Sequence, residues 1–585
     1  MIPHPLQFAD QTGSGPAVEK VERNIDFRWG VKIPLRDGVE LNATLYKPKG
    51  GAPTPAIFTL TPYIADSYHT RAYFFAQNGY AFALVDCRGR GNSGGAFEPF
   101  VNEGRDGYDV VEWLAAQPWC DGQVTMWGGS YGGFDQWTTL KEFPQHLKTI
   151  VPVASAHASF DFPFYKNIYF SYEMQWQTLV GGVTGNANLF AQQSFWIDKF
   201  QEWFHSGRPF RELDQIVGNP SPTFQTWLDQ PASSDYWQRM SLTPVEYQRI
   251  DVPILTITGH YDADQVGALE YYRQHMRYGS EKATTAHYLI IGPWDHAGTR
   301  TPLREFGGVK FGEASLVDMN KLHKEWYDWT MKGGEKPEFL KDRVAYYVMG
   351  ADEWKYAPDL NHIATEHLRL YLSSVDGAAN DVYHSGVLKT TPTYESLPDH
   401  YIYDPLDLSI ADVEKDEIKN FLTDQRYELN LFGQGLVYHS PPFLVDLEIT
   451  GHIRLSAWMA LDQPDTDFQA YLSVINPEGE YIFLSSDLLR ARFRKSSFTE
   501  KLVTPGEINC YTFEGFSFFS KLVTRGSRLR LVIKAPNSIY IQKNFNSGGA
   551  VADETPEDAK TVTVTLFHDR IRPSYLEIPI VGKKP

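Results

Sequence analysis

The chain has 585 residues, 42% of them hydrophobic, and a formal net charge of −18. This length exceeds what one hydrophobic core usually serves, so we expect two or three domains. The negative charge argues against nucleic acid or an anionic membrane as a partner and suits a neutral or cationic small molecule, although solubility alone also explains it.

Cysteine spacing and hydropathy give no sign of a metal site, a disulfide framework or a membrane span. Cys87, Cys120 and Cys510 are scattered, and an odd number of thiols cannot pair completely. The first residues, Met1-Ile-Pro-His-Pro, show no basic segment followed by an apolar one, and no uncharged apolar run approaches about 18 residues. We expect a cytoplasmic protein without membrane contact, and a secreted mature form stays open.

The amino-terminal region alternates strands and helices. The pattern predicts, in order, a hairpin over 31–48 that turns at Arg36-Asp37-Gly38, a strand over 56–60, a helix over 71–77, a strand over 80–85 and a helix over 105–116. Strands separated by helices predict a mostly parallel sheet that is covered on both faces.

A Gly-x-Ser-x-Gly pattern follows. Gly128-Gly129-Ser130-Tyr131-Gly132-Gly133 lies between the apolar run 124–127 and a predicted helix. A serine at a sharp strand-to-helix turn needs glycine neighbours, because side chains there would collide with the helix. The pattern predicts a nucleophile elbow that exposes the Ser130 hydroxyl, with the Tyr131 amide as an oxyanion donor. Chance matches occur in glycine-rich loops, so the context decides.

Residues 155–249 interrupt the alternation and are rich in aromatic side chains. We interpret this segment as a helical cap inserted over the active site, where it would exclude water and bind an apolar group. Most of its rings would form the core of the cap itself. We expect a few, including Phe160, Phe164 and Trp176, to face the substrate.

Two β-branched runs then end in chemically useful residues. The predicted strand 253–258 is followed by Asp262, and the strand 287–291 is followed by His296. Open α/β sheets place their active sites at the carboxyl ends of strands. An elbow serine needs a histidine base oriented by a carboxylate, in the chain order Ser, Asp, His. Separately, Asp262 could cap a helix and His296 could lie on the surface, but the order favours a catalytic triad.

The last part of the chain has a different character. A predicted helix over 322–331 ends at Gly333-Gly334, and from Val344 onward β-rich runs follow one another without helices. This pattern predicts a sandwich or jelly roll. The expected domains are an α/β-hydrolase fold over 1–154 and 250–340, the cap over 155–249, and an all-β jelly roll over 341–585. A rival hypothesis is a carbohydrate-binding jelly-roll protein, which would have no reason to keep three residues in triad order.

These motifs resemble the superfamily of X-Pro dipeptidyl-peptidases, cocaine esterases and α-amino-acid ester hydrolases. The resemblance covers about residues 26 to 579. It rests on the Gly-x-Ser-Tyr-Gly elbow, on Gly259-His-Tyr-Asp262 and Gly292-Pro-Trp-Asp-His296, on Thr61-Pro-Tyr63 and the loop 86–95, and on 346–354, 465–468, 476–479 and 489–492.

The resemblance implies a serine hydrolase that cleaves carboxylic esters or amides through an acyl-enzyme on Ser130, with His296 as base and Asp262 as its partner. It also implies that the Tyr63 hydroxyl is the second oxyanion donor, that no metal or cofactor is needed, and that homo-oligomers can form. The loop 86–95 lacks the Lys-Ser/Thr ending of a P-loop, so we expect Asp86 and Arg88 to be structural.

Substrate choice depends on carboxylates. In the resembling α-amino-acid ester hydrolases an acidic cluster holds the substrate ammonium, and Asp264 matches one member while Gln265 replaces another. Asp161 lies near the third position. Asp264 capping a helix and Asp161 facing solvent are equally good explanations. Three substrates stay open: an α-amino acyl ester or amide, a neutral aromatic ester, and an X-Pro peptide, which is least favoured because only about 25 residues precede the first hairpin.

Overall fold

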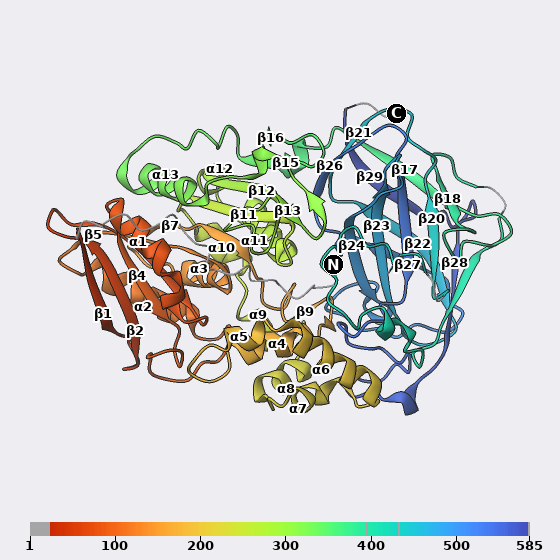
Figure 1. Ribbon diagram of the computed structural model, residues 1–585, viewed down its shortest axis with the longest axis horizontal. Coiled ribbons are helices and arrows are strands. Elements are labelled where there is room, and N and C mark those ends of the chain that lie inside the picture. The colour runs from red at the N-terminus through yellow and green to blue at the C-terminus, as the bar shows by residue number, and fades with distance from the viewer. Residues whose placement is uncertain (1–23, 394–395, 427, 431–432, 583–585) are drawn as a thin grey trace.

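The computed structural model describes residues 24–393, 396–426, 428–430 and 433–582 (Figure 1). Its first part is an α/β fold with two six-stranded sheets. In spatial order, the first sheet contains β1 (Ile25–Pro34), β2 (Glu40–Pro48), β4 (Ala81–Asp86), β3 (Thr54–Thr61), β5 (Cys120–Met126) and β7 (Leu147–Thr149). The second contains β16 (Glu353–Ala357), β15 (Val344–Val348), β12 (His287–Asp295), β11 (Ile254–Tyr261), β8 (Pro152–Ser155) and β6 (Gly128–Ser130).

The two sheets are nearly continuous, because only Trp127 separates β5 from β6. Pairing is parallel from β4 through β3 and β5 to β7, and again from β6 through β8, β11 and β12 to β15. The helices that alternate with these strands are α1 (His69–Gln77), α2 (Glu103–Ala115), α3 (Tyr131–Lys141), α11 (Gln265–Tyr278), α12 (Glu281–Thr285) and α13 (Met319–Lys332). The predicted hairpin and the mostly parallel sheet are confirmed.

Between β8 and β11 the chain forms a short hairpin and a group of helices, seen below the centre of Figure 1. These elements are β9 (Phe164–Tyr165), β10 (Ile168–Tyr169), α4 (Tyr172–Leu179), α5 (Ala187–Phe190), α6 (Gln193–Ser206), α7 (Leu213–Val217), α8 (Pro222–Asp229), α9 (Asp235–Gln238) and α10 (Pro244–Arg249). A cluster of buried aromatic rings, with Trp196, Trp203 and Trp227 among them, holds the helices together.

A small hairpin of β13 (Glu305–Phe306) and β14 (Val309–Lys310) precedes α13. Beyond β16, the described chain contains strands and single 3-10 turns but no α-helix. The strands are β17 (Glu366–Ser373), β18 (Gly386–Lys389), β19 (Asp399–Tyr403), β20 (Gly435–His439), β21 (Leu447–Gly451), β22 (Arg454–Leu461), β23 (Asp467–Ile475), β24 (Tyr481–Arg490), β25 (Asn509–Phe513), β26 (Phe519–Val523), β27 (Arg528–Lys534), β28 (Val562–Phe567) and β29 (Tyr575–Val581). Their pairing is antiparallel apart from β18 with β20, around a large apolar core.

The hairpin segment 165–171 is fastened to this β-rich region. Lys166 Nζ lies 2.6 Å from the buried Asp487 carboxylate, and Arg490 Nη1 donates to the Asn167 carbonyl at 2.7 Å. Ser171 Oγ donates to the Ile539 carbonyl at 2.7 Å. Charge-assisted hydrogen bonds of this kind are stronger than neutral ones, so the segment has a fixed position.

The turn from β6 into α3 has the strain expected of an elbow. Ser130 adopts φ 62° and ψ −124°, which is unusual for a residue with a side chain. A Cβ on Gly133 would lie 2.9 Å from both Ser155 Cα and the Val153 carbonyl oxygen, closer than packing allows. A Cβ on Gly132 would meet only the Leu60 carbonyl at 3.7 Å. The steric need for glycine therefore falls on Gly133 rather than on Gly132, the last glycine of the sequence pattern.

These two neighbouring glycines make a matched pair for a stability test. We expect Gly133→Ala to lower the free energy of unfolding by about 1 to 3 kcal/mol, because its methyl group overpacks backbone atoms of β8. Gly132→Ala should be neutral or stabilising by up to about 1 kcal/mol, because alanine favours the helix. Denaturant unfolding followed by tryptophan fluorescence compares them, and equal losses in both variants would contradict this account.

Candidate active site

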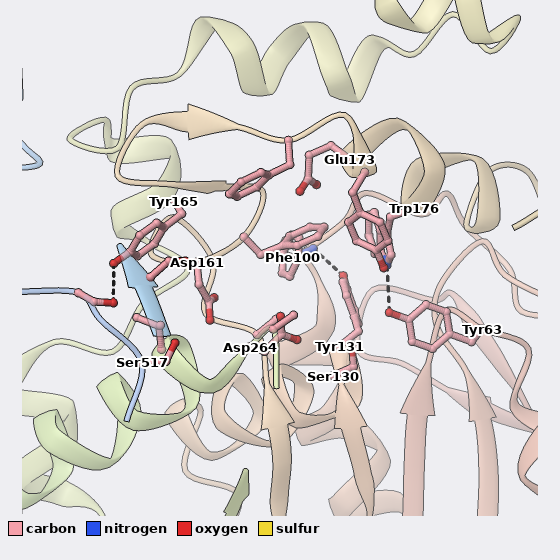
Figure 2. Close-up of a pocket in the computed structure, with 18 residues that line it drawn as sticks. Tyr63, Phe100, Ser130, Tyr131, Asp161, Tyr165, Glu173, Trp176, Asp264 and Ser517 are labelled. Atoms are coloured by element: carbon pink, nitrogen blue, oxygen red, sulfur yellow. Dashed lines mark hydrogen bonds between the residues drawn. The ribbon is translucent and has the colours of Figure 1, made fainter. Parts of the chain in front are cut away.

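A pocket of about 80 Å³ lies where the α/β sheet, the α4 segment and the carboxyl-terminal β-rich region meet (Figure 2). Ser130 is at its floor, with Tyr63 on one side. Helix α4 contributes Glu173 and Trp176, and the β-rich region contributes Ser517. The site is thus built by three parts of the chain.

The register of β11 and β12 brings Asp262 and His296 together. Tyr261 is opposite Asp295 in this parallel pair, so the next residue of each strand emerges at the same edge of the sheet. His296 Nδ1 lies 2.7 Å from Asp262 Oδ1, and both side chains are almost completely buried. Thr258 Oγ1 donates to the other Asp262 oxygen at 2.7 Å. His296 Nε2 has no hydrogen-bond partner in the described chain, so it is free to act as an acceptor.

Tyr63 directs its hydroxyl group to Ser130. It follows β3, where its amide donates to Thr61 Oγ1 at 3.1 Å. Trp176 Nε1 donates to the Tyr63 hydroxyl oxygen at 3.0 Å, and the same hydroxyl is hydrogen-bonded with Ser130. Burial raises the pKa of Tyr63, and these two hydrogen bonds lower it by less. The phenol therefore stays protonated and can donate.

The Tyr131 ring anchors the start of α3. Its hydroxyl donates to Glu103 Oε1 at 2.7 Å and accepts from the Phe100 amide at 2.6 Å. Burial raises the pKa of Glu103 to about 7. Because Glu103 and Phe100 both hold the Tyr131 hydroxyl, the position of this residue is fixed. Its backbone N–H lies at the first turn of the helix, where the helix dipole favours negative charge.

Three carboxylates face the pocket: Asp161, Glu173 and Asp264. Asp161 accepts from the amides of His157 at 2.8 Å and Gly267 at 2.6 Å, so it does not point into solvent. Asp264 stands at the N-cap position of α11, but its side chain makes no capping hydrogen bond. Its Oδ2 lies 3.7 Å from His296 Nδ1. The two alternative explanations of these aspartates, exposure and helix capping, are therefore wrong.

Glu173 is a pocket residue that sequence reasoning missed. It is 2% exposed, and its Oε2 has no hydrogen-bond partner among the described residues. Its only sequence signal is the spacing of three residues from Trp176, which puts both on one face of a helix. Burial raises the pKa of Asp161, Glu173 and Asp264, and repulsion between the carboxylates adds to this. No lysine, arginine or histidine is among the residues that line the pocket.

The three aromatic residues predicted to face the substrate lie in two different compartments. Trp176 lines the pocket of Ser130, together with Phe162, Phe170 and Tyr172. Phe160, in the loop after β8, and Phe164, at the start of β9, do not line it and instead line a second cavity. The expectation that these two rings contact the substrate beside Ser130 therefore needs correction.

The described residues show neither a metal site nor a membrane-spanning helix. No group of histidine, cysteine, aspartate and glutamate side chains there is arranged to hold a metal ion. No helix in the same part of the chain is long and apolar enough to cross a membrane.

Comparison with known proteins gives consistent relatives. Residues 37–298 match the X-Pro dipeptidyl-peptidase (S15) family, and residues 339–577 match the X-Pro dipeptidyl-peptidase C-terminal non-catalytic domain. The chain is 26% identical to cocaine esterase from Rhodococcus sp. (strain MB1 Bresler), over 96% of this chain and all of that protein. A putative serine esterase of Mycobacterium bovis is 25% identical, over 94% of each chain.

Solved structures share the fold. An α-amino acid ester hydrolase superposes with a TM-score of 0.80 at 20% identity, over 98% of this chain and 100% of the other. An aminopeptidase from the marine sediment archaeon Thaumarchaeota archaeon gives a TM-score of 0.81 at 19% identity, over 97% and 99% of the two chains. Together with the two family matches, these relatives show that the chain belongs to the X-Pro dipeptidyl-peptidase superfamily of CocE/NonD hydrolases and is a serine hydrolase.

Proposed function

We propose that this serine hydrolase cleaves esters or amides of α-amino acids that carry a free ammonium group and an aromatic side chain. The observation that carries the proposal is the pocket beside Ser130, which presents three carboxylates and no basic side chain. Buried charges without partners are costly, and a bound cation offsets that cost. The aromatic walls formed by Phe162, Phe170 and Trp176 suit a ring on the acyl group.

In the proposed reaction, His296 Nε2 takes the proton of Ser130 as the oxygen attacks the carbonyl carbon. Asp262 holds the imidazole through Nδ1 and stabilises its cation. The Tyr63 hydroxyl and the Tyr131 amide would stabilise the oxyanion. His296 then protonates the leaving group, and water releases the acid from the acyl-enzyme on Ser130 by the same steps.

We further propose that residues 155–249 act as a cap and that the strands β17 to β29 form a jelly roll. Support for the cap comes from Glu173 and Trp176, which lie on α4 and wall the pocket. The wholly β composition and mainly antiparallel pairing of the described carboxyl-terminal region support the jelly roll.

Aromatic walls also favour a second candidate, a neutral aromatic ester. Both candidates are tested by hydrolysis of p-nitrophenyl acetate, phenylglycine methyl ester, its N-acetyl analogue and Ala-Pro-p-nitroanilide. We expect Ser130→Ala to lower turnover of every cleaved substrate by about 10³-fold or more. We expect the free amine to be preferred over its acetylated twin by about tenfold, since acetylation removes the charge.

Unchanged activity in Ser130→Ala would contradict the acyl-enzyme mechanism. Equal rates for the two phenylglycine esters would favour the neutral aromatic ester. Preferred cleavage of Ala-Pro-p-nitroanilide would instead favour an X-Pro peptidase.

The hydrogen bond from Trp176 to Tyr63 gives a test of the oxyanion site. Tyr63→Phe should lower kcat by about a hundredfold or more, the usual effect of losing one oxyanion donor. Trp176→Phe keeps an aromatic wall but removes the Nε1 donor, so the Tyr63 hydroxyl is free to rotate, and kcat should fall by about three- to tenfold. The double variant should be no slower than Tyr63→Phe alone, because Trp176 acts through Tyr63. Additive losses would show that Trp176 acts on the substrate independently.

Glu173→Gln tests ammonium binding. We expect it to raise KM for phenylglycine methyl ester by about tenfold and to leave the N-acetyl analogue unchanged. Thermal stability should not fall, because the substitution removes a buried charge that has no partner. Glu202→Gln, a change at an exposed acid on α6, is the matched control and should alter neither KM.

Binding of the substrate ammonium by the pocket carboxylates also predicts that KM depends on pH. The pKa values of the pocket carboxylates are raised, so they gain protons and lose their attraction for ammonium at a higher pH than ordinary carboxylates do. KM for the free amine should fall as pH rises through this range, while KM for the N-acetyl analogue stays level. A parallel change in both would refute carboxylate recognition of the ammonium.

A further inference from the structure

A second cavity, of about 300 Å³, adjoins the pocket of Ser130. The two share three wall residues, Tyr165, Val266 and Gly515. The loop after β8 runs between them, with Asp161 on the side of the pocket and Phe160 on the side of the cavity. A molecule bound at Ser130 can therefore extend toward this second cavity if it passes the shared wall.

A hydrogen bond between Tyr165 and Gly515 closes part of the wall between the two compartments. The single hydrogen of the Tyr165 hydroxyl is shared between two acceptors, Asp487 Oδ1 at 2.8 Å and the Gly515 carbonyl at 3.0 Å, and Figure 2 shows this ring across the pocket from Trp176. A Cβ on Gly515 would lie 1.7 Å from the Tyr165 hydroxyl, so no larger residue fits there. Two small residues and one ring thus separate the compartments.

The charge of the cavity is opposite to that of the pocket. Five basic residues and one acid line it. Three of these six charges are already paired: Lys166 with Asp487 at 2.6 Å, Arg490 with Asp467 at 2.8 Å, and Glu514 with Arg454 at 2.8 Å. The other three, Arg273, Arg494 and Lys495, form no ion pair with a carboxylate in the described part of the chain.

Lys495 is exposed to solvent, whereas Arg494 and Arg273 are at least partly buried and have other partners than carboxylates. Arg494 is 9% exposed, and its Nη1 donates only to the carbonyls of Ala491 and Lys501, while its Nε has no partner among the described residues. Arg273 Nη2 donates to Nε2 of His452 at 2.5 Å. Burial lowers the pKa of His452 to about 3, so that ring is neutral. Glu270, on the same helix as Arg273, attracts its charge without an ion pair.

We infer that this cavity binds a carboxylate on the leaving group of the substrate. Cations without a carboxylate partner, one of them the buried Arg494, favour an anion, as the acids beside Ser130, among them the partnerless Glu173, favour a cation. The rings of Phe160, Phe164 and Phe498 on the cavity wall would cover the apolar part of the leaving group. The substrate would be zwitterionic, with its ammonium beside Asp161 and Glu173, its scissile carbonyl at Ser130, and its carboxylate beside Arg494 and Lys495.

The inference rests on the proposed function for the cleavage itself. The bond between the carbonyl carbon and the leaving oxygen or nitrogen breaks, His296 supplies the proton to that atom, and the distant carboxylate takes no part. Its charge therefore affects binding and positioning only.

Two esters of phenylglycine test this, one formed with 4-(hydroxymethyl)benzoic acid and the other with the primary amide of that acid. They share the scissile bond and differ in the charge of the leaving group, which lies a ring away from that bond. We expect the wild type to favour the carboxylate ester by about tenfold in kcat/KM. Lys495→Gln should reduce this preference, and Arg494→Gln/Lys495→Gln should abolish it. Lys282→Gln removes an exposed charge on α12, away from both compartments, and should leave the preference intact.

Two controls separate the possible failures. Arg494→Lys keeps the charge if Arg494→Gln does not fold, and it should retain at least part of the preference. Ser130-dependent hydrolysis of p-nitrophenyl acetate, whose leaving group has no carboxylate, should be unchanged in every cavity variant. Equal rates for the two esters in the wild type, a preference that survives in the double variant, or an equal loss in Lys282→Gln would overturn the inference. Full activity of Ser130→Ala on both esters would instead overturn the proposed function.

Discussion

The site depends on the register between two parallel strands. Because Tyr261 of β11 is opposite Asp295 of β12, the residues that follow them meet at the carboxyl edge of the sheet, and His296 and Asp262 form a buried hydrogen bond. A shift of one residue would turn each side chain to the other face. The strained turn at Ser130 belongs to the same sheet and ends at the same edge. Buried strands therefore fix the positions of Ser130, Asp262 and His296, while α4 and the loops supply other walls of the pocket.

The pocket of Ser130 and the adjoining cavity differ in the sign of the charged side chains that line them. A chain with a net charge of −18 nevertheless places three cations without a carboxylate partner around one cavity, and three carboxylates around an adjoining pocket that no basic side chain lines. The buried members, Arg494 and Glu173, are unfavourable without a ligand, since each takes a charged group out of water without an oppositely charged partner. Such sites cost stability, and their cost is offset when a complementary ligand binds.

The sequence was sufficient for the features that follow from regular structure. The hairpin, the parallel strands and the strand-end positions of Asp262 and His296 follow from hydrophobic runs and chain order. The expected role of Tyr63 as an oxyanion donor was inferred from the family resemblance alone. Phe160 and Phe164 were assigned to the wrong compartment because they lie in and next to an irregular loop, where periodicity does not predict the direction of a ring. Glu173 was missed because an acid on an aromatic helix has the same pattern whether it faces solvent or a pocket.

The fastening of segment 165–171 to the β-rich region has a consequence for access to the site. The ion pair of Lys166 with Asp487 and the bond from Arg490 to the Asn167 carbonyl hold the rim of the pocket from outside the α/β fold. A rim held by buried charged contacts does not swing open as a hinged lid does. The carboxyl-terminal region therefore helps to shape the pocket of Ser130, although it lies outside the α/β fold.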